Sequence, residues 1–318
     1  MADLVAGGAG FIGSHLCDRL VLEGRAVICA DNFLTGRRSN VEHLLCSPLF
    51  SLIELDLIEG APEVEVERIY HLASPASPPS YTRFSIETMR VNSEGTRHLL
   101  ELAARTGARF LYASTSEVYG DPLEHPQHET YRGNVSSIGP RSMYDEAKRF
   151  GEALTMAYLS SHSVDGRIVR IFNTYGPRSD PDDGRLVPNF VVQALAQRPL
   201  TIYGDGRQTR SLCFVSDLVE GLVRVMESDR TSGEVINLGS PAEHTISEYA
   251  QLIRELTGSS SQVIFTSFAV GDDPQRRRPD IAKAHDLLAW EPSIGLETGL
   301  SRTIVYFRSE ITAQEMTA

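Results

Sequence analysis

A tyrosine and a lysine in the stretch "YDEAK" have the spacing of an acid–base pair. Tyr144 and Lys148 stand at i and i+4, so they share one face of a helix. A free tyrosine titrates near pH ~10, so a base at neutral pH needs a pKa lowered by roughly 2–3 units, about 3–4 kcal/mol. One cation about 4 Å away at an effective dielectric of about 20 supplies about 4 kcal/mol. The spacing therefore predicts that Lys148 lowers the pKa of Tyr144, although an isolated match of this kind is usually a solvated helix face.

A second group of reactive side chains stands in "ASTSEVYG", roughly 30 residues before the tyrosine. There the apolar strand "RFLYAS" runs into Thr115, Ser116 and Glu117. In an open α/β sheet the carboxyl ends of the strands face the ligand crevice, so these three side chains are candidates for a reaction centre. The alternative is structural: Thr115 and Ser116 cap the strand, and Glu117 bonds to the backbone.

A glycine turn near the N-terminus has the pattern of a dinucleotide site. Gly7, Gly10 and Gly13 form GxxGxxG between a short apolar strand and an amphipathic helix. The first glycine permits the tight turn, the second lets the backbone approach a pyrophosphate, and the third lets helix and strand pack closely. The helix N-terminus then faces the phosphates with free N–H groups. The alternative is an ordinary strand–helix turn without a ligand.

A carboxylate follows the glycine turn at the distance that the dinucleotide motif requires. Asp31 ends the second strand, where it can bind a ribose 2′-hydroxyl and repel a 2′-phosphate. This position favours NAD over NADP, although Arg37 and Arg38 nearby weaken the preference. Asp56, which closes "LIELDL", can reach the adenine or can cap its own loop.

Strands and helices alternate through the first half of the chain. Such alternation predicts right-handed βαβ crossovers and a Rossmann-type, doubly wound parallel sheet with helices on both faces. After about residue 177 the alternation stops, and Pro, Gly, Asp and Arg become frequent. We therefore predict an NAD-binding domain over 1–176 and a smaller mixed α/β substrate domain over 177–318, with elements that can cross back. The predicted strands are 3–6, 26–31, 50–57, 67–74, 109–115 and 166–176, and the predicted helices are 85–107, 143–162, 187–197, 215–227 and 246–257.

The composition restricts the function classes. The chain has 318 residues, 41% of them hydrophobic, and 30 basic against 42 acidic residues leave a net charge of −12. An acidic surface argues against nucleic acid and anionic membranes as main partners. The four cysteines form no CxxC pair, and no signal peptide or long apolar run is present, so a cytoplasmic location is expected. No metal site is predicted.

Taken together, these stretches resemble the extended short-chain dehydrogenase/reductases that act on nucleotide sugars. The chain resembles the UDP-glucuronate decarboxylases, or UDP-xylose synthases, over roughly residues 3–308. The glycine turn and YxxxK are typical of the whole superfamily, whereas the remaining matches are more specific. These are "HLASPASPP", "ASTSEVYGDP", "IGPRSMYDEAKR", "RIFNTYGPR", "DDGRLVPNF", "PLTIYGDGRQTRSLCFVSDL", "NLGSPAEHTI" and "DDPQRRRPDI".

The resemblance implies a reaction and a role for each group. Tyr144 would take the proton of the sugar 4-hydroxyl as NAD oxidises C4, and the resulting β-keto acid would lose CO2. Thr115 would bond the 4-oxygen, and Ser116 and Glu117 would face the C5/C6 end of the sugar. Glu117 would either repel the substrate carboxylate or deliver a proton to C5, and both roles stay open. Arg277 would clamp the carboxylate or donate a proton, although the run "RRR" is also consistent with a solvated basic face.

The same resemblance implies the binding residues and the assembly. A homodimer through the helices 86–106 and 143–162 is expected. Glu87 stands near a position where the family usually carries lysine. The residues implied for NAD are Gly7, Gly10, Phe11, Ile12, Gly13, Asp31, Asn32, Asp56, Leu72, Ala73, Tyr144 and Lys148, and those for the UDP-sugar are Tyr81, Asn173, Arg185, Val187, Thr201, Tyr203, Arg210 and Arg277.

Three other functions remain as alternatives. An oxidative decarboxylase would release a UDP-4-keto-pentose and NADH, and the same residues would serve it. A nucleotide-sugar 4-epimerase is less consistent with Glu117 and Arg277. A non-catalytic NAD-binding regulator would be expected to lose the tyrosine or the lysine, and both are present.

Overall fold

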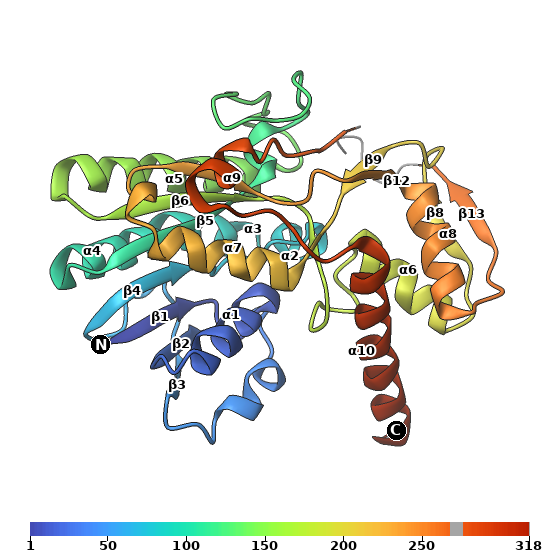
Figure 1. The fold of residues 1–318 in the computed structure, drawn as a ribbon, viewed down its shortest axis with the longest axis horizontal. Coiled ribbons are helices and arrows are strands. Elements are labelled where there is room, and N and C mark those ends of the chain that lie inside the picture. Colours follow the sequence, from blue (N-terminus) through green and yellow to red (C-terminus); the bar gives the residue numbers. More distant parts are fainter. Residues whose placement is uncertain (268–275, 318) are drawn as a thin grey trace.

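Seven parallel strands form the centre of the fold (Figure 1). The computed structural model describes residues 1–267 and 276–317. Every neighbouring pair in the sheet is parallel, so the predicted Rossmann-type fold class is confirmed. The strand order is β11-β6-β5-β4-β1-β2-β3, formed by β1 (Ala2–Ala6), β2 (Val27–Asp31), β3 (Phe50–Glu54), β4 (Val66–His71), β5 (Arg109–Thr115), β6 (Gly166–Ile171) and β11 (Val235–Leu238).

Helices cover both faces of this sheet. Helices α1 (Phe11–Leu22) and α7 (Val215–Glu227) pack together on one face, and α4 (Thr96–Thr106) and α5 (Ser142–His162) pack on the other. Successive strand residues point to opposite faces, so adjacent residues enter different cores. Val5 packs in the core beneath α1 and α7, and its neighbour Leu4 packs in the core beneath α4. Because both faces are buried, the strands are apolar runs without alternation.

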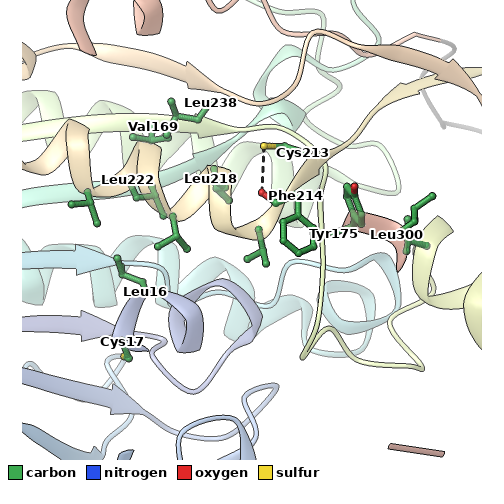
Figure 2. Packing of buried hydrophobic residues seen from close by; sticks show 14 of the residues in the cluster. Leu16, Cys17, Val169, Tyr175, Cys213, Phe214, Leu218, Leu222, Leu238 and Leu300 are labelled. Carbon is green, nitrogen blue, oxygen red and sulfur yellow. Dashed lines mark hydrogen bonds between the residues drawn. The ribbon is translucent and has the colours of Figure 1, made fainter. Parts of the chain in front are cut away.

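The larger core joins the sheet to α1 and α7 (Figure 2). Leu16 of α1 and Leu218 and Leu222 of α7 are fully buried, as are Val169 and Leu238 on the neighbouring strands. Full burial of one such side chain contributes about 1.5–3 kcal/mol. This packing holds α1 and α7 against one face of the sheet.

One strand of the sheet comes from beyond residue 177. β11 pairs with β6 from Val235↔Ile168 to Leu238↔Ile171, so residues after the predicted boundary contribute to the central sheet. The boundary at 176 itself stays a prediction.

Most of the remaining C-terminal elements lie beyond the carboxyl ends of the strands, whereas α9 (Ala282–Leu288) packs beside β11 and α7 (Figure 1). The ring of Tyr175 contacts that of Phe214 with centroids 5.5 Å apart, and the Tyr175 hydroxyl donates to the carbonyl of Leu296 at 3.3 Å. These contacts connect the two-stranded β7–β10 sheet to the last helix. The elements are β7 (Thr174–Tyr175), α6 (Leu186–Leu195), β8 (Leu200–Tyr203), β9 (Thr209–Ser211), β10 (Cys213–Phe214), β12 (Glu243–Thr245), α8 (Ile246–Thr257), β13 (Val263–Thr266), α9 (Ala282–Leu288) and α10 (Leu296–Thr317).

The helix predicted over 85–107 is not one continuous α-helix. It consists of α3 (Ser85–Arg90), a π-helical turn at Val91–Gly95, and α4. At the turn, buried Asn92 donates to Ser74 Oγ and to the Thr88 carbonyl, both at 2.8 Å, and accepts from the Tyr112 hydroxyl at 2.9 Å. A buried amide that bonds to a carbonyl of its own helix and to two partners outside it is consistent with a local change of helix type. Among the described residues, no helix is long and apolar enough to cross a membrane.

Candidate active site

The glycine turn has the shape that the dinucleotide motif predicts. Gly7 has φ +77°, and a Cβ there would lie 2.7 Å from the backbone of Ala73. A Cβ on Gly13 would lie 2.1 Å from the Gly7 carbonyl oxygen. Only glycine fits these two positions, because the strand, the turn and the start of α1 are in direct contact. The result is a shallow cradle at a helix N-terminus, which fits a pyrophosphate.

Asp31 is buried at the end of β2, and the turn itself holds its carboxylate. Its oxygens accept from the backbone N–H groups of Ala9 at 2.9 Å and Phe33 at 2.8 Å. Burial raises the pKa of Asp31, and these two hydrogen bonds lower it in part. The carboxylate lines a small cavity of about 70 Å³ together with Asn32 and Asp56. That position fits a ribose or an adenine.

Asp56 makes the loop contact that the sequence left as an alternative. Its oxygens accept from the backbone N–H of Ile58 at 2.9 Å and from the amide of Asn32 at 3.2 Å. It therefore caps its own loop and also lines the small cavity beside Leu72 and Ala73. Neither interpretation excludes the other.

Arg37 lies on the cofactor side of the cavity but is already paired. Its guanidinium forms an ion pair with Asp180, and its backbone N–H donates to the Ala9 carbonyl at 3.0 Å. His15 contacts the Pro177 carbonyl at 2.9 Å, and Arg178 pairs with Asp18 at 2.7 Å. The segment 177–180 is thus tied to α1 and its flanking loop. An arginine engaged in this way does not offer the free cation that a 2′-phosphate needs, which favours NAD.

A larger cavity of about 440 Å³ lies at the carboxyl ends of the strands and adjoins the first. The structure brings every residue predicted for the site to one or both cavities. The small cavity is lined by Gly7, Gly10, Asp31, Asn32, Asp56, Leu72 and Ala73. The large cavity is lined by Gly7, Gly10, Phe11, Ile12, Gly13, Leu72, Tyr81, Thr115, Ser116, Glu117, Tyr144, Lys148, Asn173, Arg185, Val187, Thr201, Tyr203, Arg210 and Arg277.

Tyr144 and Lys148 face the cavity from α5, but the predicted direction of the tyrosine pKa shift is wrong. Burial raises the pKa of Tyr144 to about 12, and a hydrogen bond with the Thr115 hydroxyl offsets only part of this. Lys148 Nζ donates to the Ala113 carbonyl at 2.8 Å and lies 5.9 Å from the Tyr144 ring centre. Burial also lowers the pKa of Lys148 to about 7. The estimate from spacing counted the attraction of the cation and omitted the desolvation of both groups.

The phenol ring of Tyr144 is held on one side by a second tyrosine. Tyr81, from α2 (Pro78–Arg83), stacks on it with ring centres 4.9 Å apart and an interplanar angle of 9°. Both rings line the large cavity. The stacking fixes the plane of Tyr144, so that its hydroxyl stays beside Thr115.

Thr115 caps a backbone turn at the end of its strand and also lines the large cavity, so both interpretations of this residue apply. Thr115 Oγ1 accepts from the backbone N–H of Glu117 at 3.2 Å and so caps the short 3₁₀ turn Ser116–Tyr119. The side chain of Glu117 does not bond to the backbone as the alternative proposed. It forms ion pairs with Arg277 and, at 2.5 Å, with Arg141.

Arg141 is the site residue that sequence reasoning missed. It precedes α5, three residues before Tyr144, and lines the large cavity. The available signal was its place in "IGPRSMYDEAKR", one turn ahead of a tyrosine already assigned to the site. Although burial alone would raise it, Arg277, Arg141 and Arg210 hold the pKa of Glu117 at about 2. Glu117 is therefore ionised at neutral pH.

Arg277 reaches the cavity because a distant loop holds its segment. Gln127 is fully buried, its side chain accepts from the backbone N–H of Arg278 at 2.9 Å, and its backbone pairs with Arg278 and Asp280. Arg277 itself donates to the Gly120 carbonyl at 2.8 Å. Residues 272–275 of the matching stretch "DDPQRRRPDI" lie outside the described residues.

The part of the large cavity that is lined by β8, β9 and the start of α6 carries residues predicted for the nucleotide. Thr201 and Tyr203 lie on β8, and Arg210 lies on β9, where its guanidinium donates to the Thr209 carbonyl at 2.8 Å. Arg185 and Val187 stand at the start of α6, the latter fully buried. This end offers guanidinium groups and backbone to an anionic diphosphate.

The fold and this site define a class of proteins. Residues 4–239 match the NAD dependent epimerase/dehydratase family, and the chain belongs to it. The family is NAD-dependent by description, and the glycine cradle and the buried Asp31 fit that cofactor. The resemblance seen in the sequence is thereby confirmed at the level of the family.

Individual relatives are more specific. The chain is 53% identical to UDP-glucuronic acid decarboxylase 1 of Xenopus tropicalis over 98% of its own length and 73% of that protein. It is 52% identical to UDP-glucuronic acid decarboxylase 1 of Arabidopsis thaliana, over 98% and 71% respectively. A crystal structure of UDP-glucuronic acid 4-epimerase from Bacillus cereus with UDP-glucuronic acid and NAD is also similar, with a TM-score of 0.87 and 30% identity. That match covers 98% of this chain and 100% of the epimerase chain.

Proposed function

We propose that this protein is an NAD-dependent UDP-glucuronate decarboxylase that forms UDP-xylose and CO2. The observation that carries the proposal is the ionised Glu117 held by Arg277 and Arg141 in the same cavity as Tyr144 and Thr115. Because they line the same cavity as the tyrosine, these charged groups can act on the C6 end of the sugar when C4 is beside Tyr144. The relatives at 52–53% identity that carry the decarboxylase name support the same activity.

The reaction proceeds in three steps at C4, C5 and C6. The proton of the sugar 4-hydroxyl passes to Tyr144 as C4 is oxidised to a ketone. The C5–C6 bond then breaks, its electrons enter the enolate of the 4-ketone, and CO2 leaves. C5 then takes up a proton from solvent in the place that C6 occupied, and reduction of the ketone restores the 4-hydroxyl. Bound NAD supplies the oxidant for the first step, the reductant for the last, and a positive charge beside the phenol.

The chain's own residues serve orientation and charge. Thr115, next to Tyr144, is placed to bond the 4-oxygen in both its hydroxyl and its enolate form. An ionised Glu117 cannot donate a proton to C5, so its charge state supports an electrostatic role for it. Asn173 and Arg210 line the same cavity and are proposed to bind the UDP group.

The epimerase alternative has a specific observation against it. The Bacillus cereus epimerase binds UDP-glucuronic acid by name, so recognition of this substrate alone does not distinguish the two activities. The pairing of Glu117 with two arginines beside the predicted C6 position favours chemistry at C5 and C6 over simple C4 inversion. The higher identity to the decarboxylases agrees with this preference.

The test is the product formed from UDP-glucuronate and catalytic NAD, followed by NMR with absorbance at 340 nm. UDP-xylose without accumulation of NADH is the expected result. A UDP-4-keto-pentose with NADH would instead identify the oxidative decarboxylase. Formation of UDP-galacturonate with no CO2 would replace the proposal by the 4-epimerase.

The activity is expected to rise with pH through about 7. The pair Tyr144 and Lys148 can accept the substrate proton only after it has lost one proton of its own. Lys148 has a pKa of about 7 and Tyr144 a pKa of about 12, so Lys148 loses its proton first. The measurement is kcat/KM between about pH 5.5 and 9. In Lys148→Arg the inflection should vanish, because a guanidinium does not titrate in this range. A wild-type profile that is flat below pH 7 would contradict the assignment.

We propose that the protein is a homodimer that pairs through α3 and α5. Helices α3 and α5 are in contact with each other and expose several large apolar side chains. Large apolar side chains exposed on two helices that are in contact are typical of an interface. The exposed residues are Ile86, Met89, Phe150 and Met156.

We also propose a cytoplasmic location for the protein, in keeping with its four free cysteine thiols.

A charge at Phe150 is expected to weaken the dimer. Phe150 is 51% exposed on α5, and a two-fold axis would bury two copies of it. Loss of about 2 kcal/mol per copy raises the dimer dissociation constant about 10³-fold. Light scattering of Phe150→Glu over a concentration series measures this. Leu22→Glu, at the exposed last residue of α1, is the control, and an unchanged dimer in both variants would refute the interface.

A further inference from the structure

Glu117 lies between two arginines that come from different parts of the fold. Its Oε1 pairs with Nη1 of Arg277, and its Oε2 lies 2.5 Å from Nη2 of Arg141. Arg141 directly precedes the helix that carries Tyr144, whereas Arg277 enters from the C-terminal segment. The side chains of all three residues are at most 15% exposed.

Arg277 has a donor left for another acceptor. Its Nη2 bonds to the Gly120 carbonyl, but its Nε is buried without a hydrogen-bond partner among the described residues. A buried N–H that makes no hydrogen bond lowers the stability of the protein by about 1–3 kcal/mol. A carboxylate is the acceptor that suits a guanidinium. A substrate carboxylate in the cavity would satisfy this group.

A carboxylate at Arg277 would compete with Glu117. If Arg277 were the only partner of Glu117, the substrate would leave a buried anion without a cation, at a penalty of about 3–5 kcal/mol. The contact of Arg141 with the second oxygen of Glu117 removes this conflict. Its backbone belongs to the start of α5, so its position does not depend on the C-terminal segment.

We propose that Arg141 is a positioning residue that holds Glu117 in place while Arg277 turns from Glu117 to the substrate carboxylate. The proposal rests on the proposed function and assigns a task to a residue outside the sequence prediction. Arg141 is then the permanent partner of Glu117, and Arg277 is the exchangeable one. The electrostatic field at C5 and C6 stays defined when substrate enters.

The charges around Glu117 determine the expected pH dependence. Removal of Arg141 takes away one of the cations that lower the Glu117 pKa against the effect of burial, so the pKa rises. Glu117 then becomes protonated, and inactive in an electrostatic role, at a higher pH than in the wild type. The groups that face Glu117 are Arg277 and Arg210 from the C-terminal region, Arg141 and Tyr144 at α5, and Tyr81 from α2.

The test compares Arg141→Gln and Arg141→Lys in the holoenzyme. For Arg141→Gln we expect kcat for CO2 release to fall about 10²-fold, with KM for UDP-glucuronate within about threefold. The pKa of the Glu117 carboxyl, followed directly by carbon-13 NMR of the labelled side chain, should rise by about one unit. Arg141→Lys keeps the charge, so it should restore the Glu117 pKa and about tenfold of the rate. Arg97→Gln, from a surface pair with Glu101, is the control.

Three outcomes would overturn the proposal. A KM raised more than about tenfold with kcat retained would make Arg141 a direct ligand of the substrate carboxylate. An unchanged Glu117 pKa in Arg141→Gln would leave Arg141 a structural role only. If Arg141→Gln does not fold, a Glu117 pKa that rises in Arg141→Lys would contradict the charge argument.

A binding measurement separates this proposal from the proposed function. Calorimetry in the Tyr144→Phe background compares UDP-glucuronate with UDP-glucose, with and without Arg141→Gln. Preference for UDP-glucuronate in both supports the positioning role. If the protein with Arg141 intact does not prefer UDP-glucuronate, the result contradicts both the proposed function and the positioning role. Loss of the preference only in Arg141→Gln would overturn the positioning role alone.

Discussion

The variant Tyr144→Phe is expected to lose the first oxidation, with kcat lowered by at least about 10³-fold. Tyr144 is the only described phenol that both lines the large cavity and contacts Thr115, and phenylalanine keeps the ring stacked on Tyr81. Binding of the UDP-sugar should therefore persist while the proton transfer is lost. Absorbance at 340 nm in a single turnover reports the oxidation, and NMR reports the products.

A matched control is available on the same helix. Tyr158 lies on α5, away from the cavity, with its ring stacked on His162 at 4.7 Å. Tyr158→Phe keeps that ring contact and should retain the wild-type rate. Turnover by Tyr144→Phe at a rate close to that of this control would refute the assignment of Tyr144 as the base.

The variant Glu117→Gln is expected to slow CO2 release by about 10²-fold or more. A glutamine keeps the shape of the side chain but not the negative charge that Arg277 and Arg141 bind. The first oxidation uses Tyr144 and Thr115, so NADH should still form in a single turnover. A 4-keto uronate with NADH, formed ahead of CO2, would show that the step affected is the loss of C6.

Stability must be measured beside the rate of Glu117→Gln. Loss of one member of a buried ion pair leaves the arginines uncompensated and destabilises a fold by about 3–5 kcal/mol. Thermal unfolding therefore accompanies the kinetics, and Glu146→Gln serves as the control because its pair with Arg149 is partly exposed at 3.8 Å. Decarboxylation by a folded Glu117→Gln at the wild-type rate would reduce Glu117 to a structural role.

The sequence by itself determined the elements whose chemistry is local. Gly7, Gly10 and Gly13 must share one turn because their spacing is short, and the structure shows no room there for a side chain at Gly7 or Gly13. The interval from that turn to Asp31 is set by one helix and one strand. Tyr144 and Lys148 share a face because the helical repeat requires it. The strand–helix alternation likewise predicts the parallel sheet.

Tertiary structure alone decided the charges and partners in the site. The direction of the Tyr144 pKa shift depends on desolvation, which spacing cannot report, and burial proved larger than the opposing hydrogen bond with Thr115. Arg141 and Glu117 are 24 residues apart in the sequence, and they meet because the end of β5 lies beside the start of α5. The π-helical turn at Asn92 likewise depends on partners from other segments.

The placement of Arg277 shows the physical reason most directly. Its segment is held by Gln127, a residue 151 positions from its partner Arg278, through hydrogen bonds that no local pattern encodes. Local spacing sets which groups a helix or turn presents together, because backbone geometry repeats over a few residues. Long-range packing sets which groups from different elements meet, how far they are desolvated, and hence which of them carries charge at neutral pH.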